Sequence, residues 1–403
     1  MISKDPDLQR VKNADLVVLG NRRIFENLEA KSYLNFAAFS PPSILTRSIM
    51  DEWYKDYSSL GASAYSLWVN QRDRLRERLS VLINCGPESI GFGNSTSGLI
   101  SDVTLMLDWK KNDRVLVFNG DFPSIIYPVK NAVMQFGLEL VMHELDGFGD
   151  HSGKGLERIE NELKKGLRLI ALSSTQFHTG LLLPIKEIAR LCRKYDAEIL
   201  VDAAQSCGAI DFDVIDEDID YLMAPTHKWL MGIEGAAFIY ISDRAMDRLV
   251  FRRTGWMSYE NGLEFLFGEP NKMSYENSVK KRPSFVELGM ANSIGFAALE
   301  AGISAHLSIG MRNIANYIQQ LHDRIENGLL EIGYQSVRAK NKSARSSILS
   351  FLPPTGMKTV DLAKKFSDNS VAISTPDGHL RFAPSWPTNE TEVDYMLNVA
   401  NSI

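Results

Sequence analysis

The sequence predicts an α/β fold in which a mostly parallel central sheet lies between helices, with a smaller α+β domain at the C-terminal end. The main observation is that short, almost continuously apolar runs alternate with segments whose apolar residues recur at helical spacing. A second observation is size: 403 residues with 44% hydrophobic content are ample for a large core and more than one domain. A third is a change of character after residue 255, described below.

Five apolar runs predict the strands of the first domain, and each is almost continuously apolar rather than alternating. They are residues 114–118, 168–173, 198–201, 221–223 and 236–241. Such runs are typical of parallel strands buried on both faces, and residues 184–192 between the second and third run have helical spacing. Ligands of such sheets lie beyond the carboxyl ends of the strands, where Asp202 and the turn 119–122 both fall.

The stretch 255–283 is rich in Asn, Gly, Glu and aromatic residues without a clear period, and it predicts a long loop. After it, apolar residues at helical spacing predict a helix over 311–329. Strand-like runs follow at 347–351 and 380–384, and Thr388 opens a terminal helix with a capping signal. We therefore predict a large domain and a small domain, with the boundaries 25–272 for the large one and 1–24 plus 273–403 for the small one.

Charge and cysteine content exclude several classes of function. The net charge of −6, from 44 basic and 50 acidic residues, includes no basic block that would favour nucleic acid or an anionic membrane. Three cysteines are too few for a disulfide framework and have no metal-binding spacing, and the seven histidines show no His-Glu-x-x-His pattern. From these spacings we expect no metal site. We see neither a leader-like N-terminus nor an apolar run near the roughly 20 residues of a membrane span, so we expect a cytoplasmic protein.

Lys228 and Asp202 carry the strongest chemical information. Lys228 follows His227 in the run Ala-Pro-Thr-His-Lys-Trp-Leu-Met-Gly, and Asp202 ends the strand-like run 198–201. Taken alone, a lysine is usually a surface residue and an aspartate after a strand is often a helix cap. Together they are what a pyridoxal phosphate (PLP) enzyme needs, because a lysine forms a Schiff base with the cofactor aldehyde and an acid keeps the pyridine nitrogen protonated.

These motifs resemble the class V aminotransferase family of fold-type I PLP enzymes. That family includes cysteine desulfurases, kynureninases, isopenicillin N epimerase-like proteins and C–S lyases. The resemblance runs from Tyr33 to the C-terminal helix, and its core is Val201-Asp202-Ala203-Ala204-Gln205-Ser206 followed by His227-Lys228-Trp229. It implies the PLP-dependent transferase fold of type I, an amino-acid substrate, and a homodimer with shared active sites.

The resemblance also implies the cofactor-binding residues. Lys228 would form the Schiff base, Asp202 would face the pyridine nitrogen, and Gln205 would contact the phenolic oxygen. Ser95 and Thr96 match the family's phosphate loop, and hydroxyl and N–H groups that open a helix bind phosphate well. His227 would also reach the phosphate, and Gln176 would line the cofactor pocket.

Two further residues follow from the resemblance, and three positions depart from it. Phe122 would stack on the cofactor ring where desulfurases have a histidine, so acid–base work would fall more heavily on Lys228. Arg381 would clamp the substrate α-carboxylate, because a guanidinium matches a carboxylate in bidentate geometry. Pro225 stands where the family often has a serine. Met290 stands where the family tends to have a threonine that reaches the neighbouring subunit's phosphate.

The sequence leaves the reaction open. A desulfurase of this family needs a mobile cysteine near the clamping arginine, and residues 360–381 contain none. Our leading prediction is an aminotransferase-like enzyme acting on an α-amino acid or a related metabolite. The alternatives are a lyase that cleaves a C–S bond or performs another β-elimination, an epimerase, or a non-catalytic regulator with this fold.

Overall fold

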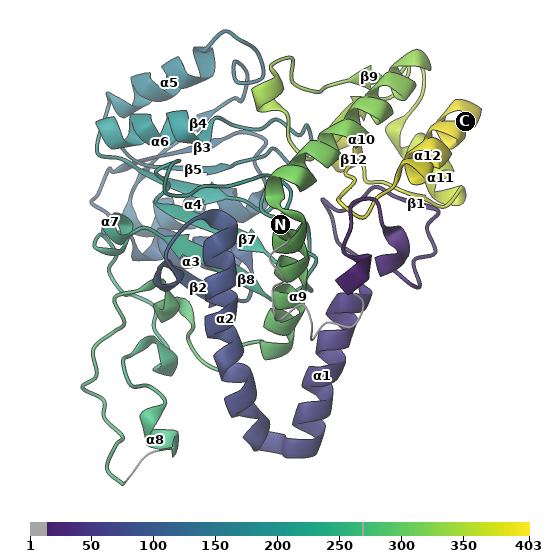
Figure 1. The fold of residues 1–403 in the computed structure, drawn as a ribbon. Helices are drawn as coiled ribbons and strands as arrows, with labels where there is room; N and C mark the ends of the chain where they lie inside the picture. Colours follow the sequence, from purple (N-terminus) through teal and green to yellow (C-terminus); the bar gives the residue numbers. More distant parts are fainter. Residues whose placement is uncertain (1–13, 268–269) are drawn as a thin grey trace.

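The computed structural model describes residues 14–267 and 270–403. Its centre is a seven-stranded sheet whose neighbouring strands follow the order β2-β8-β7-β6-β5-β3-β4 (Figure 1). The strands are β2 (Ile90–Gly93), β3 (Arg114–Phe118), β4 (Glu139–His143), β5 (Leu167–Ser173), β6 (Glu198–Asp202), β7 (Tyr221–Pro225) and β8 (Ala237–Ile241). Only β8 runs antiparallel to its neighbours within this sheet, so the predicted mostly parallel sheet is confirmed.

Both faces of the sheet are covered, which explains why its central strands are almost continuously apolar. Leu169 and Ala171 of β5 belong to the core that includes α3 (Thr96–Met106) and α4 (Pro123–Phe136). Ile170 and Leu172 point the other way, because side chains alternate along a strand. They belong to the core that includes α5 (Lys154–Leu163) and α6 (Ile185–Lys194). The short helix α7 (Asp243–Met246) follows β8.

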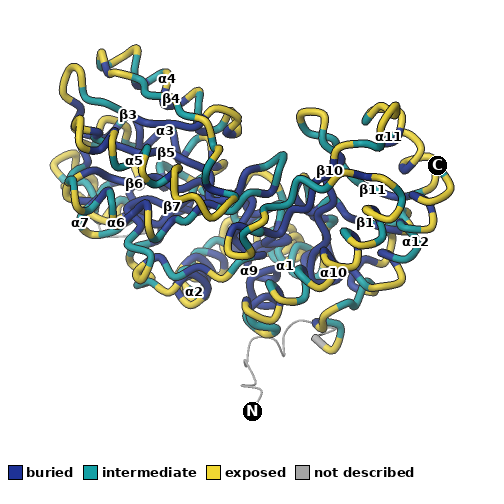
Figure 2. Tube along the Cα trace, turned by 90° about the horizontal axis from the view of Figure 1, so that it is seen from above, coloured by how far each residue is buried: buried dark blue, intermediate teal, exposed yellow. Residues whose placement is uncertain are grey.

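Helix α9 (Ser293–Ile309) joins the two lobes of the molecule. It packs against α1 (Ile44–Leu60) and α2 (Tyr65–Ile83), which form a V at one end of the molecule (Figure 1). Twelve of its residues are buried, so it is apolar on nearly all sides, as expected for a helix enclosed by others. Figure 2 shows a buried core in each lobe with α9 between them.

The second lobe is built on a separate core. It contains α10 (Met311–Glu331), β9 (Gln335–Ser336), β10 (Leu349–Leu352), α11 (Thr359–Asp368), β11 (Val371–Ala372), β12 (Leu380–Phe382), α12 (Glu390–Ser402) and the early strand β1 (Ser32–Tyr33). The predicted helices and strands of this region are confirmed. The cap of α12 is Asn389 rather than Thr388, because the Asn389 side chain accepts from the Glu392 backbone and Glu392 reciprocates. The division at residue 273 stays a prediction. Helix α9 lies beyond that residue and packs with the core of the first lobe.

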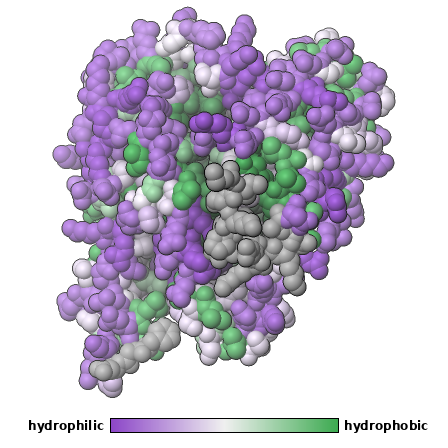
Figure 3. Space-filling model, in the orientation of Figure 1, coloured by the Kyte–Doolittle hydropathy of each residue, from purple (hydrophilic) through white to green (hydrophobic). Residues whose placement is uncertain are grey.

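The predicted long loop projects from the first lobe at the lower left of Figure 1. Within its described residues it holds one 3₁₀ turn, Trp256–Ser258, and the four-residue helix α8 (Glu264–Phe267). The face seen in Figure 3 is predominantly hydrophilic, with separate hydrophobic areas. No single described helix is long and apolar enough to span a membrane; α9 and α10 meet that test only as a pair bent by 83°.

Candidate active site

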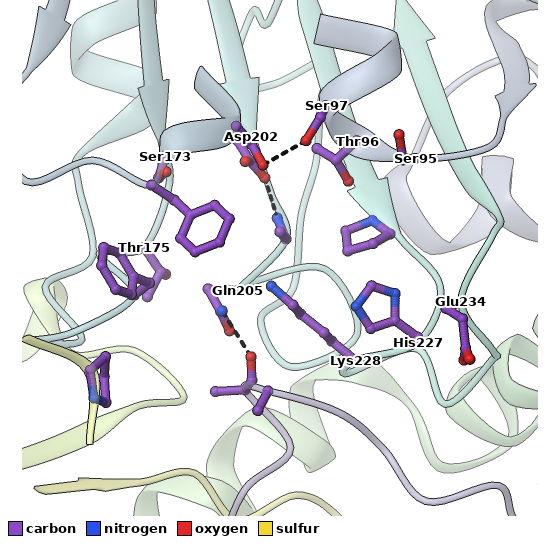
Figure 4. Close-up of a pocket in the computed structure, with 18 of the residues that line it drawn as sticks. Ser95, Thr96, Ser97, Ser173, Thr175, Asp202, Gln205, His227, Lys228 and Glu234 are labelled. Carbon is purple, nitrogen blue, oxygen red and sulfur yellow. Dashed lines mark hydrogen bonds between the residues drawn. The ribbon is translucent and has the colours of Figure 1, made fainter. Parts of the chain in front are cut away.

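A pocket of about 560 Å³ lies where strands β5, β6 and β7 end, between the two lobes. It gathers many residues of the first lobe, several of which are labelled in Figure 4, with Pro376 and Arg381 of the second lobe. Eight of the nine predicted site residues line it: Ser95, Thr96, Phe122, Asp202, Gln205, His227, Lys228 and Arg381. The tertiary fold therefore brings together nearly the whole predicted set.

Asp202 is the last residue of β6, and its side chain is only 3% exposed. One carboxylate oxygen accepts a hydrogen bond of 2.8 Å from the Ala204 backbone N–H. Burial raises the pKa of Asp202, while that hydrogen bond and the nearby Lys228 ammonium act against the rise. A cationic group in the pocket would favour the charged carboxylate, which is the state needed to hold a protonated ring nitrogen.

Lys228 follows β7 in a turn, and its side chain extends into the pocket between Gln205 and His227 (Figure 4). Its Nζ lies 5.6 Å from the centre of the Phe122 ring. Burial lowers the pKa of Lys228 to about 8, Asp202 opposes this shift, and Arg381 adds to it. More of the amine is therefore neutral near physiological pH than in an ordinary lysine, and the neutral form is the one that acts as a nucleophile and proton acceptor.

The hydroxyl-rich end of the pocket lies at the start of α3. Ser95 caps this helix, because its Oγ accepts from the Gly98 backbone N–H at 3.1 Å. The Oγ1 atom of Thr96 is buried and has no hydrogen-bond partner among the described residues. Ser97 contacts Ser124 through their hydroxyls at 2.8 Å. A helix start with spare hydroxyl and N–H groups suits a phosphate group.

His227 lines the pocket beside this end, and its ring centre lies 5.5 Å from that of Phe39. Burial and the neighbouring Lys228 lower the pKa of His227 to about 4. Its imidazole is consequently neutral at physiological pH and offers one N–H donor rather than a positive charge. Thr226 points its hydroxyl at the Ile233 carbonyl oxygen, so this hydroxyl donates within the protein.

Two aromatic rings form one wall. Phe122 precedes α4 and is 42% exposed, and this exposure is toward the pocket that it lines. Phe177 follows β5 and meets Phe122 edge to face, with ring centres 5.2 Å apart. Sequence reasoning predicted Phe122 but missed Phe177, whose position directly after the predicted residue Gln176 was the available signal.

Arg381 comes from β12 of the second lobe and is 5% exposed. Its Nε donates to Ser374 Oγ at 2.9 Å, and its Nη1 donates to the Phe177 carbonyl oxygen at 2.7 Å. Burial lowers the pKa of Arg381 to about 10. The guanidinium has no carboxylate partner within residues 14–267 and 270–403, so its remaining N–H groups can bind an anionic ligand in the pocket that it lines.

Of the two glutamines predicted to lie in the pocket, Gln205 lines it and Gln176 does not. Gln205 lines the pocket, where its amide is held by the Ala37 carbonyl oxygen at 2.9 Å and by the Trp229 indole at 3.0 Å. The prediction that Gln176 lines the pocket is wrong. Its amide is fully buried and donates to Asp121 Oδ1 at 2.7 Å, because the turn after β5 directs Gln176 inward and Phe177 outward.

These features fit PLP group by group. The buried amine of Lys228 can hold the aldehyde, and the Asp202 carboxylate can face the ring nitrogen. The unpartnered Thr96 hydroxyl at the start of α3 can receive the phosphate. Phe122 supplies a flat apolar surface for the ring. The fit rests on the donors and acceptors that the described residues leave free.

The fold and this pocket define a PLP-dependent enzyme that acts on amino acids or compounds derived from them. The sequence model described as aminotransferase class-V matches residues 33–392, and the chain belongs to this family. The predicted family, fold and cofactor are thereby confirmed.

Similar proteins include a probable desulfurase and two lyases. A probable cysteine desulfurase of Methanothermobacter thermautotrophicus is 28% identical over 75% of this chain and 74% of its own length. The hercynylcysteine sulfoxide lyase of Schizosaccharomyces pombe is 27% identical over 54% of this chain and 55% of its own length. Among solved structures, the cystine C–S lyase C-DES in complex with its product cysteine persulfide has a TM-score of 0.84 at 22% identity. The structural alignment covers 94% of this chain and 99% of the C-DES chain. At this identity the likeness shows the fold.

Proposed function

We propose that this protein is a PLP-dependent lyase that cleaves the Cβ–S bond of a cysteine-derived amino acid by β-elimination. The observation that carries the proposal is a pocket that combines the Lys228 amine with the Arg381 guanidinium and contains no thiol. All three cysteines are free, and none lines the pocket. The relatives named for C–S cleavage support this choice of bond.

The lack of a thiol in the pocket supports elimination over transfer of sulfur to an enzyme cysteine. Burial raises the pKa values of Cys85 and Cys207 to about 12, so neither is a thiolate at physiological pH. An enzyme thiol that accepts sulfur is therefore not offered by this pocket. β-Elimination needs no such thiol, because the sulfur leaves with the substituent that it already carries.

Four residues of the pocket have a role in this reaction. Bound PLP supplies an electron sink conjugated to the substrate Cα. Arg381 would hold the α-carboxylate and thereby orient the bonds at the substrate Cα. The neutral Lys228 amine removes the Cα proton and keeps it on Nζ, from which it can be passed to the departing sulfur. Asp202 keeps the proton on the ring nitrogen, and the Phe122 ring cannot take part in proton transfer.

The test is the product balance from cystine and from S-alkyl cysteines. Elimination predicts pyruvate and ammonia in equal amounts, without any added keto acid. A variant with Cys85, Cys192 and Cys207 replaced by alanine serves as the matched control and should keep its activity per folded enzyme. Loss of activity in this variant, or product formation that depends on a keto acid, would contradict the lyase proposal; the second result would favour transamination.

We further propose that the protein is a homodimer in a reducing, cytoplasmic compartment. The projecting loop supports a dimer, because it exposes large hydrophobic side chains: Trp256, Phe265, Leu266, Met273 and Tyr275. The three free cysteines support the compartment. Light scattering coupled to gel filtration tests the dimer, and charged substitutions at Phe265 and Met273 should yield the mass of a single chain.

A further inference from the structure

A buried hydrogen-bonded pair, Asp121 and Gln176, lies directly behind the aromatic wall of the pocket. Gln176 Nε2 donates to Asp121 Oδ1 at 2.7 Å, and the Ser173 backbone N–H donates to Asp121 Oδ2 at 3.4 Å. Both side chains are nearly inaccessible, with exposures of 6% for Asp121 and 0% for Gln176. Neither lines the pocket, and neither has a role in the reaction described above.

Each member of the pair is followed in the chain by one ring of the wall. Asp121 precedes Phe122 in the turn after β3, and Gln176 precedes Phe177 in the turn after β5. The hydrogen bond therefore ties together two turns that are more than 50 residues apart in the chain. The edge-to-face contact of the two rings, at 5.2 Å between their centres, lies next to this tie.

The turn that carries Gln176 and Phe177 also contacts the Arg381 guanidinium of the second lobe. The Phe177 carbonyl oxygen accepts the 2.7 Å hydrogen bond from Arg381 Nη1. A shift of the turn that carries Gln176 and Phe177 would move this acceptor and rotate the guanidinium plane about its other contact, Ser374. A bidentate contact with a carboxylate depends on the orientation of that plane.

We propose that the Asp121–Gln176 pair is a positioning element that sets the Phe122–Phe177 wall and, through the Phe177 carbonyl, the orientation of Arg381. The inference rests on the proposed function in one respect, since it takes Arg381 as the carboxylate-binding residue. Burial also raises the pKa of Asp121 to about 7, and the nearby Asp202 adds to this shift. The carboxyl group thus remains an acceptor for Gln176 whether or not it carries a proton.

The test uses three measurements that need no turnover: the melting temperature, the Kd of the apoprotein for PLP, and the Kd of the holoenzyme for propionate. Asp121→Ala and Gln176→Met each remove the pair. Both variants should raise the Kd for PLP and the Kd for propionate roughly tenfold, which is the loss of binding expected for about one well-formed hydrogen bond. Tyr221→Phe is the matched control, because it removes a buried 2.9 Å hydrogen bond to Glu198 at the other end of the sheet. It should lower the melting temperature and leave both Kd values unchanged.

A reciprocal swap tests the pair itself. The double variant Asp121→Asn/Gln176→Glu restores a donor opposite an acceptor and should bring both Kd values to within about threefold of the wild type. If Asp121→Ala and Gln176→Met behave like Tyr221→Phe, or if the swap does not recover binding, the inference is overturned.

An Arg381→Ala variant separates this inference from the proposed function. If this variant leaves the propionate Kd unchanged, both the carboxylate-binding role of Arg381 and the positioning of Arg381 by the Asp121–Gln176 pair are refuted. If this variant raises the propionate Kd strongly while Asp121→Ala does not, the carboxylate-binding role of Arg381 is kept and only the positioning role of the Asp121–Gln176 pair is overturned.

Discussion

Replacing Arg381 by alanine should reduce kcat/KM for α-amino acids roughly 100-fold and leave amines without a carboxylate nearly unaffected. A guanidinium has five N–H groups, and the contacts with Ser374 and Phe177 use two of them. One N–H on Nη1 and two on Nη2 remain, which is enough for a two-point contact with a carboxylate. At about 1.5 kcal/mol for each such bond, the loss is about 3 kcal/mol, which corresponds to a factor of about 100 or more.

The assay compares kcat/KM for an amino acid and for its decarboxylated amine, in the wild type and in Arg381→Ala. Arg381→Lys is the control, because it keeps the charge and loses the planar fork. It should recover only part of the lost factor. Equal losses for the amino acid and the amine would refute the reasoning, since they would show that Arg381 acts on the fold of the pocket rather than on the carboxylate.

Four further predictions concern the cofactor end and the core. Lys228→Met should prevent borohydride from fixing the cofactor to the chain, as followed by intact mass; fixation at an unchanged level would exclude Lys228 as the attachment point. In the cofactor-free protein the folded pKa of Lys228, about 8, lies below its ordinary value of 10.5, so the unfolded chain binds more protons between these values. Stability should therefore rise across that window by up to about 3 kcal/mol, and denaturant titrations of Lys228→Met should lack the rise. Phe122→Ala should weaken PLP roughly tenfold in fluorescence titrations, with Phe122→Tyr as the control; an unchanged Kd would argue against stacking. Burial lowers the pKa of His322 to about 3, so stability should fall as the pH drops from 6.5 toward 3, and His322→Leu should reduce this fall in melting temperature; identical acid profiles would contradict the assignment.

The large-domain fold could be predicted because its physical causes are local. Strands buried on both faces are almost continuously apolar, and the runs at β3, β5, β6, β7 and β8 show this directly. The start of α12 was misplaced by one residue, because both Thr388 and Asn389 are competent caps. Only the reciprocal contact of Asn389 with Glu392 distinguishes them.

The sequence by itself placed Asp202 and Lys228 just after predicted strands, because apolar runs mark where such strands end and neighbouring parallel strands bring their ends to one edge. The resemblance of the motifs to the family then implied the roles of these two residues and of the hydroxyls of Ser95 and Thr96. Only the tertiary structure decided that Phe177 faces the pocket while Gln176 turns inward to Asp121. In a turn no period sets the direction of a side chain. Here a hydrogen bond between residues 55 positions apart sets it, and a local pattern does not contain such a contact.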